Sequence, residues 1–148
     1  MASSKATGRV SESLKARREL AATSKKLAKL NREIATQMIV LASQTGDVNA
    51  LVESAEMLRQ SRDLFGPENT PRENAEIHLI LASTLYQIAR ANRDAAALKS
   101  AITEYRHAIT LASVTNNQAL RARVRKDYAR AKDLSRELGD NISRKGAA

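Results

Sequence analysis

The sequence contains no cysteine and no tryptophan, and its 148 positions hold only two histidines, two prolines, five glycines and four aromatic residues. The absence of cysteine excludes disulfides, thiolate metal sites and cysteine nucleophiles. No apolar run approaches the roughly 20 residues of a membrane-spanning helix, and no signal-peptide core follows Met1. A hydrophobic content of 43% excludes a disordered polyelectrolyte. We therefore expect one cytoplasmic domain with its own core.

Long stretches without a helix breaker dominate the chain, and they are rich in Ala, Leu, Arg, Lys and Glu, which favour helices. No segment alternates with the period of a strand. Local signals predict helix N-caps at Asp47, Thr70, Asp94 and Thr115, and helix stops at Gly66-Pro67 and Gly139. The sequence thus predicts an all-α domain over 11–139 with helices at about 11–44, 48–65, 71–91, 95–113 and 116–138. Residues 1–10 and 140–148 are predicted to be flexible tails.

The chain repeats itself at an offset of 47 residues. The matching pairs are Ala35 and Ala82, Met38 and Leu85, Leu41 and Ile88, Ala42 and Ala89, Asp47 and Asp94, Ala50 and Ala97, Leu51 and Leu98, Leu58 and Tyr105, Arg59 and Arg106, and Leu64 and Leu111. Small residues let helix backbones approach closely, and a single hairpin cannot bury its apolar stripe without a neighbour. We therefore predict a short α-solenoid of two helical hairpins followed by a C-terminal capping helix.

At these residues the sequence resembles the tetratricopeptide repeat family. The second unit matches its pattern at Leu81-Ala82, Leu85, Ala89, Ala101-Ile102, Tyr105, Ala108-Ile109 and Leu111, and the first unit matches it at Ile34-Ala35, Met38 and Ala42. The resemblance covers about residues 28–112. The chain departs from the family in a period longer than the usual 34 residues and in a long inter-helix loop between Ala89 and Ala101.

The resemblance implies a non-catalytic interaction module, an adaptor or scaffold, whose first helices line a concave groove for a partner protein. Motif position assigns these residues to the groove: Lys29, Arg32, Thr36, Ile39, Val40, Leu79, Ser83, Tyr86, Gln87, Arg123, Lys126 and Arg130, with Glu76 on the same face. An apolar floor between basic ends suits an acidic or amphipathic segment. The family's carboxylate-clamp pattern is missing, so a terminal carboxylate is not the expected ligand. The alternative is that these residues are solvated or packed under the long first helix.

Apolar residues recur every seven positions in the long first helix, at Leu20, Leu27, Ile34 and Leu41. This apolar stripe has three interpretations: packing along its own hairpin, self-association into a homo-oligomer, or binding to an anionic membrane surface. Ser24 and Asn31 at the intervening heptad positions weigh against a strong coiled coil. The lack of Trp and Phe on the apolar face weighs against a membrane.

The net charge of +9 is unevenly distributed. Residues 1–32 carry a net +7, residues 33–70 a net −4, residues 71–118 a net +1 and residues 119–148 a net +5. Charge alone can support nonspecific nucleic-acid binding, which keeps a basic nucleic-acid-binding protein as an alternative function. The basic segments lack the interleaved aromatics that would stack on single strands, so we favour solvated faces, including Arg121, Arg125, Lys132 and Arg136 on the capping helix.

No pattern predicts chemistry. His78 and His107 lie in different predicted helices without a metal-ligand spacing, the glycines stand singly, and no serine sits in a nucleophile elbow. We therefore expect no enzymatic activity, no cofactor and no metal site, with His78 at the surface or the edge of the core.

Overall fold

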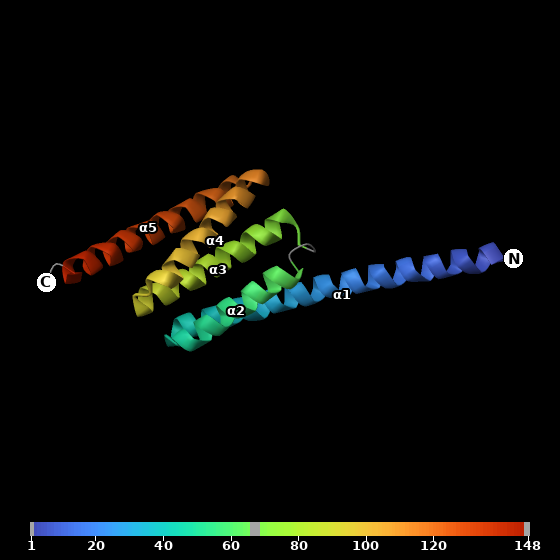
Figure 1. Ribbon diagram of the computed structural model, residues 1–148, viewed down its shortest axis with the longest axis horizontal. Helices are drawn as coiled ribbons and strands as arrows, with labels where there is room; N and C mark the ends of the chain where they lie inside the picture. The colour runs from blue at the N-terminus through green and yellow to red at the C-terminus, as the bar shows by residue number, and fades with distance from the viewer. Residues whose placement is uncertain (1, 66–68, 147–148) are drawn as a thin grey trace.

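The computed structural model describes residues 2–65 and 69–146, with side chains described at 8–64 and 69–139. Five helices follow one another in this part of the chain: α1 (Ala2–Thr45), α2 (Val48–Phe65), α3 (Pro71–Asn92), α4 (Ala95–Val114) and α5 (Gln118–Gly146) (Figure 1). The described residues contain no strand. The predicted all-α fold with five helices is therefore confirmed.

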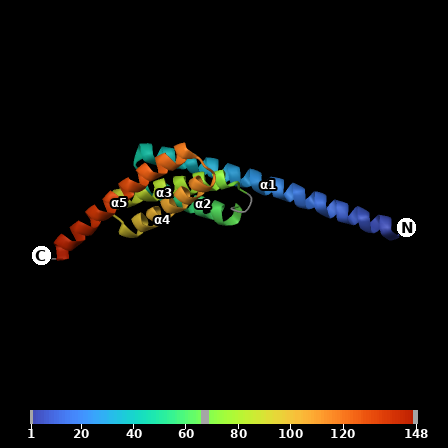
Figure 2. The ribbon, with the colours of Figure 1, turned by 90° about the horizontal axis from the view of Figure 1, so that it is seen from above.

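The helices stack in chain order, each packing mainly against its neighbour in the sequence. Helices α1 and α2 form one hairpin, α3 and α4 form a second, and α5 packs against α4 (Figure 1). Only the C-terminal part of α1 lies against the other helices, and its N-terminal part extends away from them (Figures 1 and 2). The end of α5 points away from the body on the opposite side, so the molecule is elongated.

Three turns in the stack have the same backbone geometry. Each contains one residue in the left-handed region, at Gly46 (φ 73°), Arg93 (φ 51°) and Asn116 (φ 54°). The next backbone N–H donates to an alanine carbonyl five residues earlier, in the pairs Asp47 to Ala42 (3.1 Å), Asp94 to Ala89 (3.0 Å) and Asn117 to Ala112 (3.0 Å). This arrangement is a Schellman motif, which satisfies the carbonyls at a helix end and reverses the chain within two or three residues.

The residue that closes each turn also caps the next helix. A side-chain oxygen of Asp47, Asp94 and Asn117 accepts a hydrogen bond from the backbone N–H of Ala50, Ala97 and Leu120, respectively. The predicted caps at Asp47 and Asp94 are confirmed, and so is Thr70, whose hydroxyl accepts from the N–H of Glu73 at 3.2 Å. The predicted cap at Thr115 is wrong, because its hydroxyl donates back to Leu111 and Asn117 caps α5 instead.

Several predicted helix ends are wrong in the same direction, because the helices run further than predicted. Helix α1 begins at Ala2 instead of residue 11, and α5 continues to Gly146 instead of ending at residue 138. Only Arg93 and Asp94 separate α3 from α4, so the long inter-helix loop predicted between Ala89 and Ala101 is helical apart from that turn. A single internal glycine such as Gly139 costs a helix only about 1 kcal/mol, which does not stop a helix surrounded by strong helix formers.

Equivalent alanines of the two repeat units are equally buried, whereas equivalent residues at the α1 end of the stack differ in burial. The alanine pairs, Ala35 with Ala82 and Ala42 with Ala89, are at most 1% exposed, as close helix packing requires. Leu41, in contrast, is 62% exposed, whereas its equivalent Ile88 is 5% exposed. The reason is that α3 is covered by both α2 and α4, whereas α1 packs mainly on α2.

The helix-internal Gly139 and the turn residue Gly46 are expected to respond oppositely to alanine. Gly139→Ala should stabilise the protein by about 1 kcal/mol, because alanine favours helices and the added Cβ meets no atom within 4 Å. Gly46→Ala should destabilise it by about 1–2 kcal/mol, because the left-handed conformation at φ 73° disfavours a Cβ. Thermal unfolding followed by circular dichroism measures both changes, and shifts of the same sign would contradict these backbone assignments.

Candidate functional site

A groove of about 340 Å³ lies between α1, α3 and α5. Helices α1 and α3 are the first helices of the two repeat units, and α5 takes the place of a third first helix after the second hairpin. Its lining consists of Thr36, Ile39 and Val40 from α1, Glu76, Leu79, Ile80 and Ser83 from α3, and Leu120, Arg123 and Asp127 from α5. On each helix these residues fall at positions i, i+3, i+4 and i+7 or a subset of them, so they share one face. Six predicted site residues meet here: Thr36, Ile39, Val40, Leu79, Ser83 and Arg123.

The groove has an apolar floor and mixed charges. Leu79 is buried, Ile39, Ile80 and Leu120 are half-buried, and Val40 is exposed. The charged lining residues are Glu76, Arg123 and Asp127. The lining of the groove thus carries two acidic side chains and one basic side chain.

Arg32 connects the groove to a basic pocket further along α1. It lines a cavity with Thr36 and Glu76, and a second one of about 320 Å³ with Lys25, Lys26, Lys29 and Glu73. Its side chain is mostly buried, yet Nη1 has no hydrogen-bond partner. The nearest carboxylate oxygen, Oε2 of Glu73, is 4.0 Å away, which is too far for a hydrogen bond. Nη1 is therefore a buried donor without a hydrogen-bond acceptor.

The other predicted site residues lie outside the groove. Tyr86 and Arg130 line a separate cavity of about 460 Å³ between α3 and α5, together with Arg90, Arg93, Asp133, Leu134 and Glu137. Gln87 accepts a hydrogen bond from the Ser43 hydroxyl at 2.8 Å and thereby links α3 to α1. Lys126 is exposed on α5. The twelve residues assigned from motif positions are thus distributed over more than one surface.

A buried tyrosine, Tyr105, interacts with two residues that line the groove, Ser83 and Asp127. Tyr105 on α4 is buried, and burial is the main cause that raises the pKa of its hydroxyl, with the negative charge of Asp127 adding to the effect. A hydrogen bond with Ser83 partly offsets this rise. Since Ser83 and Asp127 both line the groove, Tyr105 contributes to positioning its wall.

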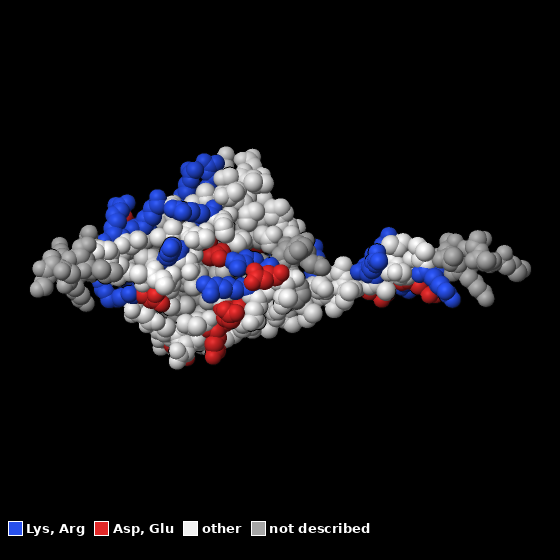
Figure 3. All heavy atoms as spheres, in the orientation of Figure 1, with Lys and Arg blue, Asp and Glu red and all other residues white. Residues whose placement is uncertain are grey.

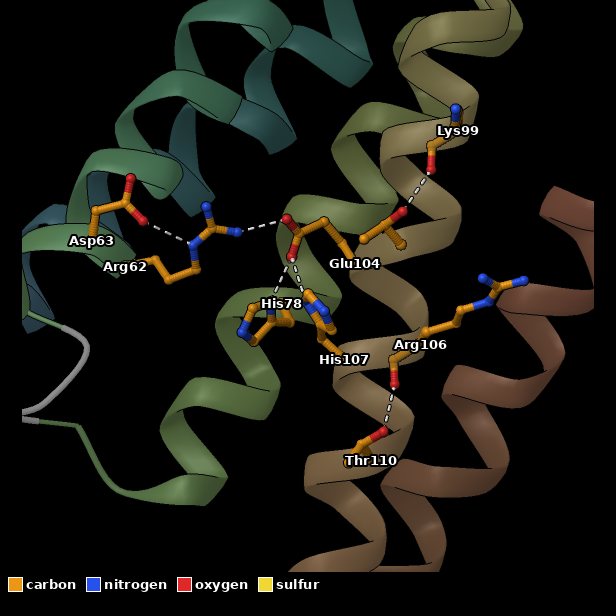
Figure 4. A network of polar contacts seen from close by, with 9 residues as sticks. Arg62, Asp63, His78, Lys99, Glu104, Arg106, His107 and Thr110 are labelled. Carbon is orange, nitrogen blue, oxygen red and sulfur yellow. Dashed lines mark hydrogen bonds and ion pairs between the residues drawn. The ribbon is translucent and has the colours of Figure 1, made fainter.

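A second cluster of polar side chains joins α2, α3 and α4, and the sequence did not predict it (Figure 4). Glu104 is buried, with Oε1 accepting a hydrogen bond from Nη1 of Arg62 at 2.6 Å and Oε2 lying 2.5 Å from Nδ1 of His78. Nδ1 of His107 is 4.0 Å from the same Oε2, and the two imidazole rings meet edge to face at 5.2 Å. The cluster thus unites both histidines around one carboxylate.

Hydrogen bonding keeps Glu104 ionised in this setting. Burial opposes the charged form and raises the pKa of Glu104. Hydrogen bonds and charge interactions with His78 and Arg62 together lower this pKa by more than burial raises it, so it lies below the usual value for a glutamate. The pKa of Arg62 is lowered by burial and raised more strongly by Glu104 and Asp63, so it lies above its usual value. Both groups are therefore charged at neutral pH.

The position of the hairpin turn could have revealed this cluster. A hairpin that reverses at Arg93 and Asp94 places His78, about 15 residues before the turn, beside His107, about 13 residues after it. Glu104 and His107 are three residues apart and share a face of α4. A ligand spacing within one helix could not indicate this cluster, because its histidines come from two helices.

The exposed face of α5 is basic. Figure 3 shows Lys and Arg gathered over α5, whereas acidic side chains lie further towards the middle of the same view. Nε of Arg106 donates to the Tyr128 hydroxyl at 3.1 Å, and the Lys132 ammonium lies 4.5 Å above the Tyr128 ring. The hydrogen bond from Arg106 is the main cause that lowers the pKa of Tyr128. Because Arg106 contacts the hydroxyl of Tyr128 and Lys132 covers its ring, Tyr128 is not available to stack on a nucleic-acid base.

Comparisons with protein-family models, curated proteins and solved structures found no match for this chain. None of the helices in the described part of the chain is both long and apolar enough to span a membrane.

Proposed function

We propose that this protein is a non-catalytic interaction module, similar to tetratricopeptide repeat proteins, which holds an amphipathic partner segment between α1, α3 and α5. The observation that carries this proposal is that α1, α3 and α5 all contribute to one groove with an apolar floor. Segments bound by such a groove present apolar anchors at helical spacing, and these anchors supply most of the affinity.

The charges in and beside the groove favour a particular orientation of the partner. Glu76 and Asp127 in the lining repel acidic residues, whereas Arg32 and Lys29 on α1, in a neighbouring pocket, attract them. Nη1 of Arg32 can donate a hydrogen bond to an acidic side chain of the partner, because this buried atom has no hydrogen-bond acceptor within the protein. We therefore expect the bound segment to place apolar residues on the floor and an acidic residue beside Arg32.

Val40 and Val52 provide a matched pair for testing the groove. Val40 lines the groove and is 52% exposed, whereas Val52 lies on α2, outside that lining, and is 49% exposed. Val40→Glu is expected to reduce recovery of the partner in a pull-down from native lysate at least about tenfold, because it places a charge in the centre of the contact. Val52→Glu is expected to leave recovery unchanged, and both variants should keep the thermal stability of the wild type.

Equal recovery of the same proteins by both variants would contradict the groove as the binding surface. Recovery of RNA or DNA that falls steeply with salt and is lost in Arg125→Glu would instead support the nucleic-acid alternative. A charge-reversed Lys29→Glu variant examines the orientation, because it should weaken capture of an acidic segment while leaving the apolar floor intact.

A further inference from the structure

Three side chains of metal-binding types converge where α3 packs against α4. His78 comes from α3, and Glu104 and His107 come from α4, and one ligand atom from each lies within 4.8 Å of the other two (Figure 4). We propose that these three residues form a binding site for Zn²⁺ or another divalent transition-metal ion. The site is separate from the proposed groove, since none of the three residues lines it.

The donor set selects the class of metal. Two imidazole nitrogens and one carboxylate oxygen suit Zn²⁺, Co²⁺, Ni²⁺ and Cu²⁺, whereas Mg²⁺ and Ca²⁺ prefer oxygen ligands throughout. No thiolate competes, because the chain has no cysteine. The site is therefore expected to discriminate against the abundant hard cations.

The spacing of the ligand atoms is close to that of a metal site. A tetrahedral ion with metal–nitrogen distances of about 2.0–2.1 Å holds its ligand atoms roughly 3.3 Å apart. The observed separations from Oε2 of Glu104 lie on either side of this value, at 2.5 Å to Nδ1 of His78 and 4.0 Å to Nδ1 of His107. Binding of the ion releases to solvent the proton that Nδ1 of His78 shares with Oε2, and the two atoms then move apart around the metal. Because the side chain of His107 is 57% exposed, it can rotate to close the longer distance without disturbing the core.

Arg62 supports the site without being a ligand. Its guanidinium holds Oε1 of Glu104, which leaves Oε2 directed at the two imidazoles. Outer-shell hydrogen bonds of this kind orient the ligands of protein metal sites. The positive charge of Arg62 is in turn balanced by Asp63, whose Oδ1 accepts from Nε at 3.2 Å.

The exposed edge at His107 gives an ion a path to the site. Three protein ligands leave the fourth tetrahedral position for water, as in open zinc sites. Because the ligands come from both helices of one hairpin, a bound ion would link α3 to α4 and stabilise the folded chain.

The chain is well suited to a direct test because it contains only two histidines. Untagged protein is titrated with Zn²⁺ while the two sets of imidazole proton resonances are followed by NMR, and affinity is measured by calorimetry. We expect one equivalent to shift both sets of resonances together. The exposed-ligand variant His107→Gln should weaken binding by at least about tenfold.

Asp133→Asn is the control, because it removes an exposed carboxylate on α5 that contacts Arg136 and is not part of the cluster. It should bind Zn²⁺ with the affinity of the wild type, and circular dichroism should show both variants folded. Unshifted imidazole resonances at saturating Zn²⁺, or the same affinity in His107→Gln as in the wild type, would overturn the proposal.

Discussion

Ile88→Ala is expected to lower the free energy of unfolding by about 2–5 kcal/mol, because it leaves a cavity in the core between stacked helices. Leu41→Ala, at the equivalent position of the first repeat, should change it by less than about 0.5 kcal/mol, because Leu41 is already exposed. Symmetry of the repeat alone would give both substitutions the same cost. Urea unfolding followed by circular dichroism at 222 nm measures the difference between them.

This pair of variants also tests whether the exposed face of α1 meets another chain. If that face is solvated, the small effect of Leu41→Ala should not depend on protein concentration. A large effect that grows with concentration would instead show that Leu41 is buried in a homo-oligomer, because association adds its free energy to the apparent stability. Sedimentation of the wild type gives an independent measure of the oligomeric state.

Glu104→Leu is expected to destabilise the protein by about 2–3 kcal/mol, because it leaves Arg62 with a partly buried charge and no partner on α4. This carboxylate connects three helices, since it contacts Arg62 on α2 and His78 on α3. Denaturant unfolding should therefore show the transition at a lower urea concentration with an unchanged slope.

A double variant distinguishes an unpaired charge from lost packing. Arg62→Met combined with Glu104→Leu removes both members of the pair, and it should recover most of the stability lost in Glu104→Leu. Asp63→Asn, which removes the more exposed partner of Arg62, should cost less than about 1 kcal/mol. A double variant as unstable as the sum of its single variants would contradict a coupled ion pair.

The helices and most of their caps could be predicted from local sequence, because hydrogen bonds within about five residues decide them. Asp47, Thr70 and Asp94 cap the helices they were predicted to cap. Asn117 was missed because Thr115 precedes a similar pattern and the third turn was not recognised as a copy of the first two. The predicted start of α1 and the predicted end of α5 are wrong, because a single glycine there is too weak a breaker to end a helix.

The groove was partly predictable, because a repeat assigns equivalent faces to equivalent helices. Thr36 and Ser83 are related by the 47-residue offset, and both line the groove. Tyr86 and Gln87 lie outside the groove although their equivalents Ile39 and Val40 line it. Tyr86 lines the cavity against α5, and Gln87 is hydrogen-bonded to Ser43 on α1. The contribution of α5 depended on its register against α4, and no repeat unit specified that register.

The scarcity of glycine, proline, cysteine and aromatics was enough to establish an all-helical chain without thiol chemistry, because helix formation is a local property. The buried and exposed states of Leu41 and Ile88 could not be read from a repeat that treats them alike, because burial depends on how many helices cover a position. The meeting of His78, Glu104 and His107 likewise required the hairpin to fold, since the carboxylate and the imidazoles come from different helices. Local patterns specify which faces exist, whereas packing decides which side chains meet.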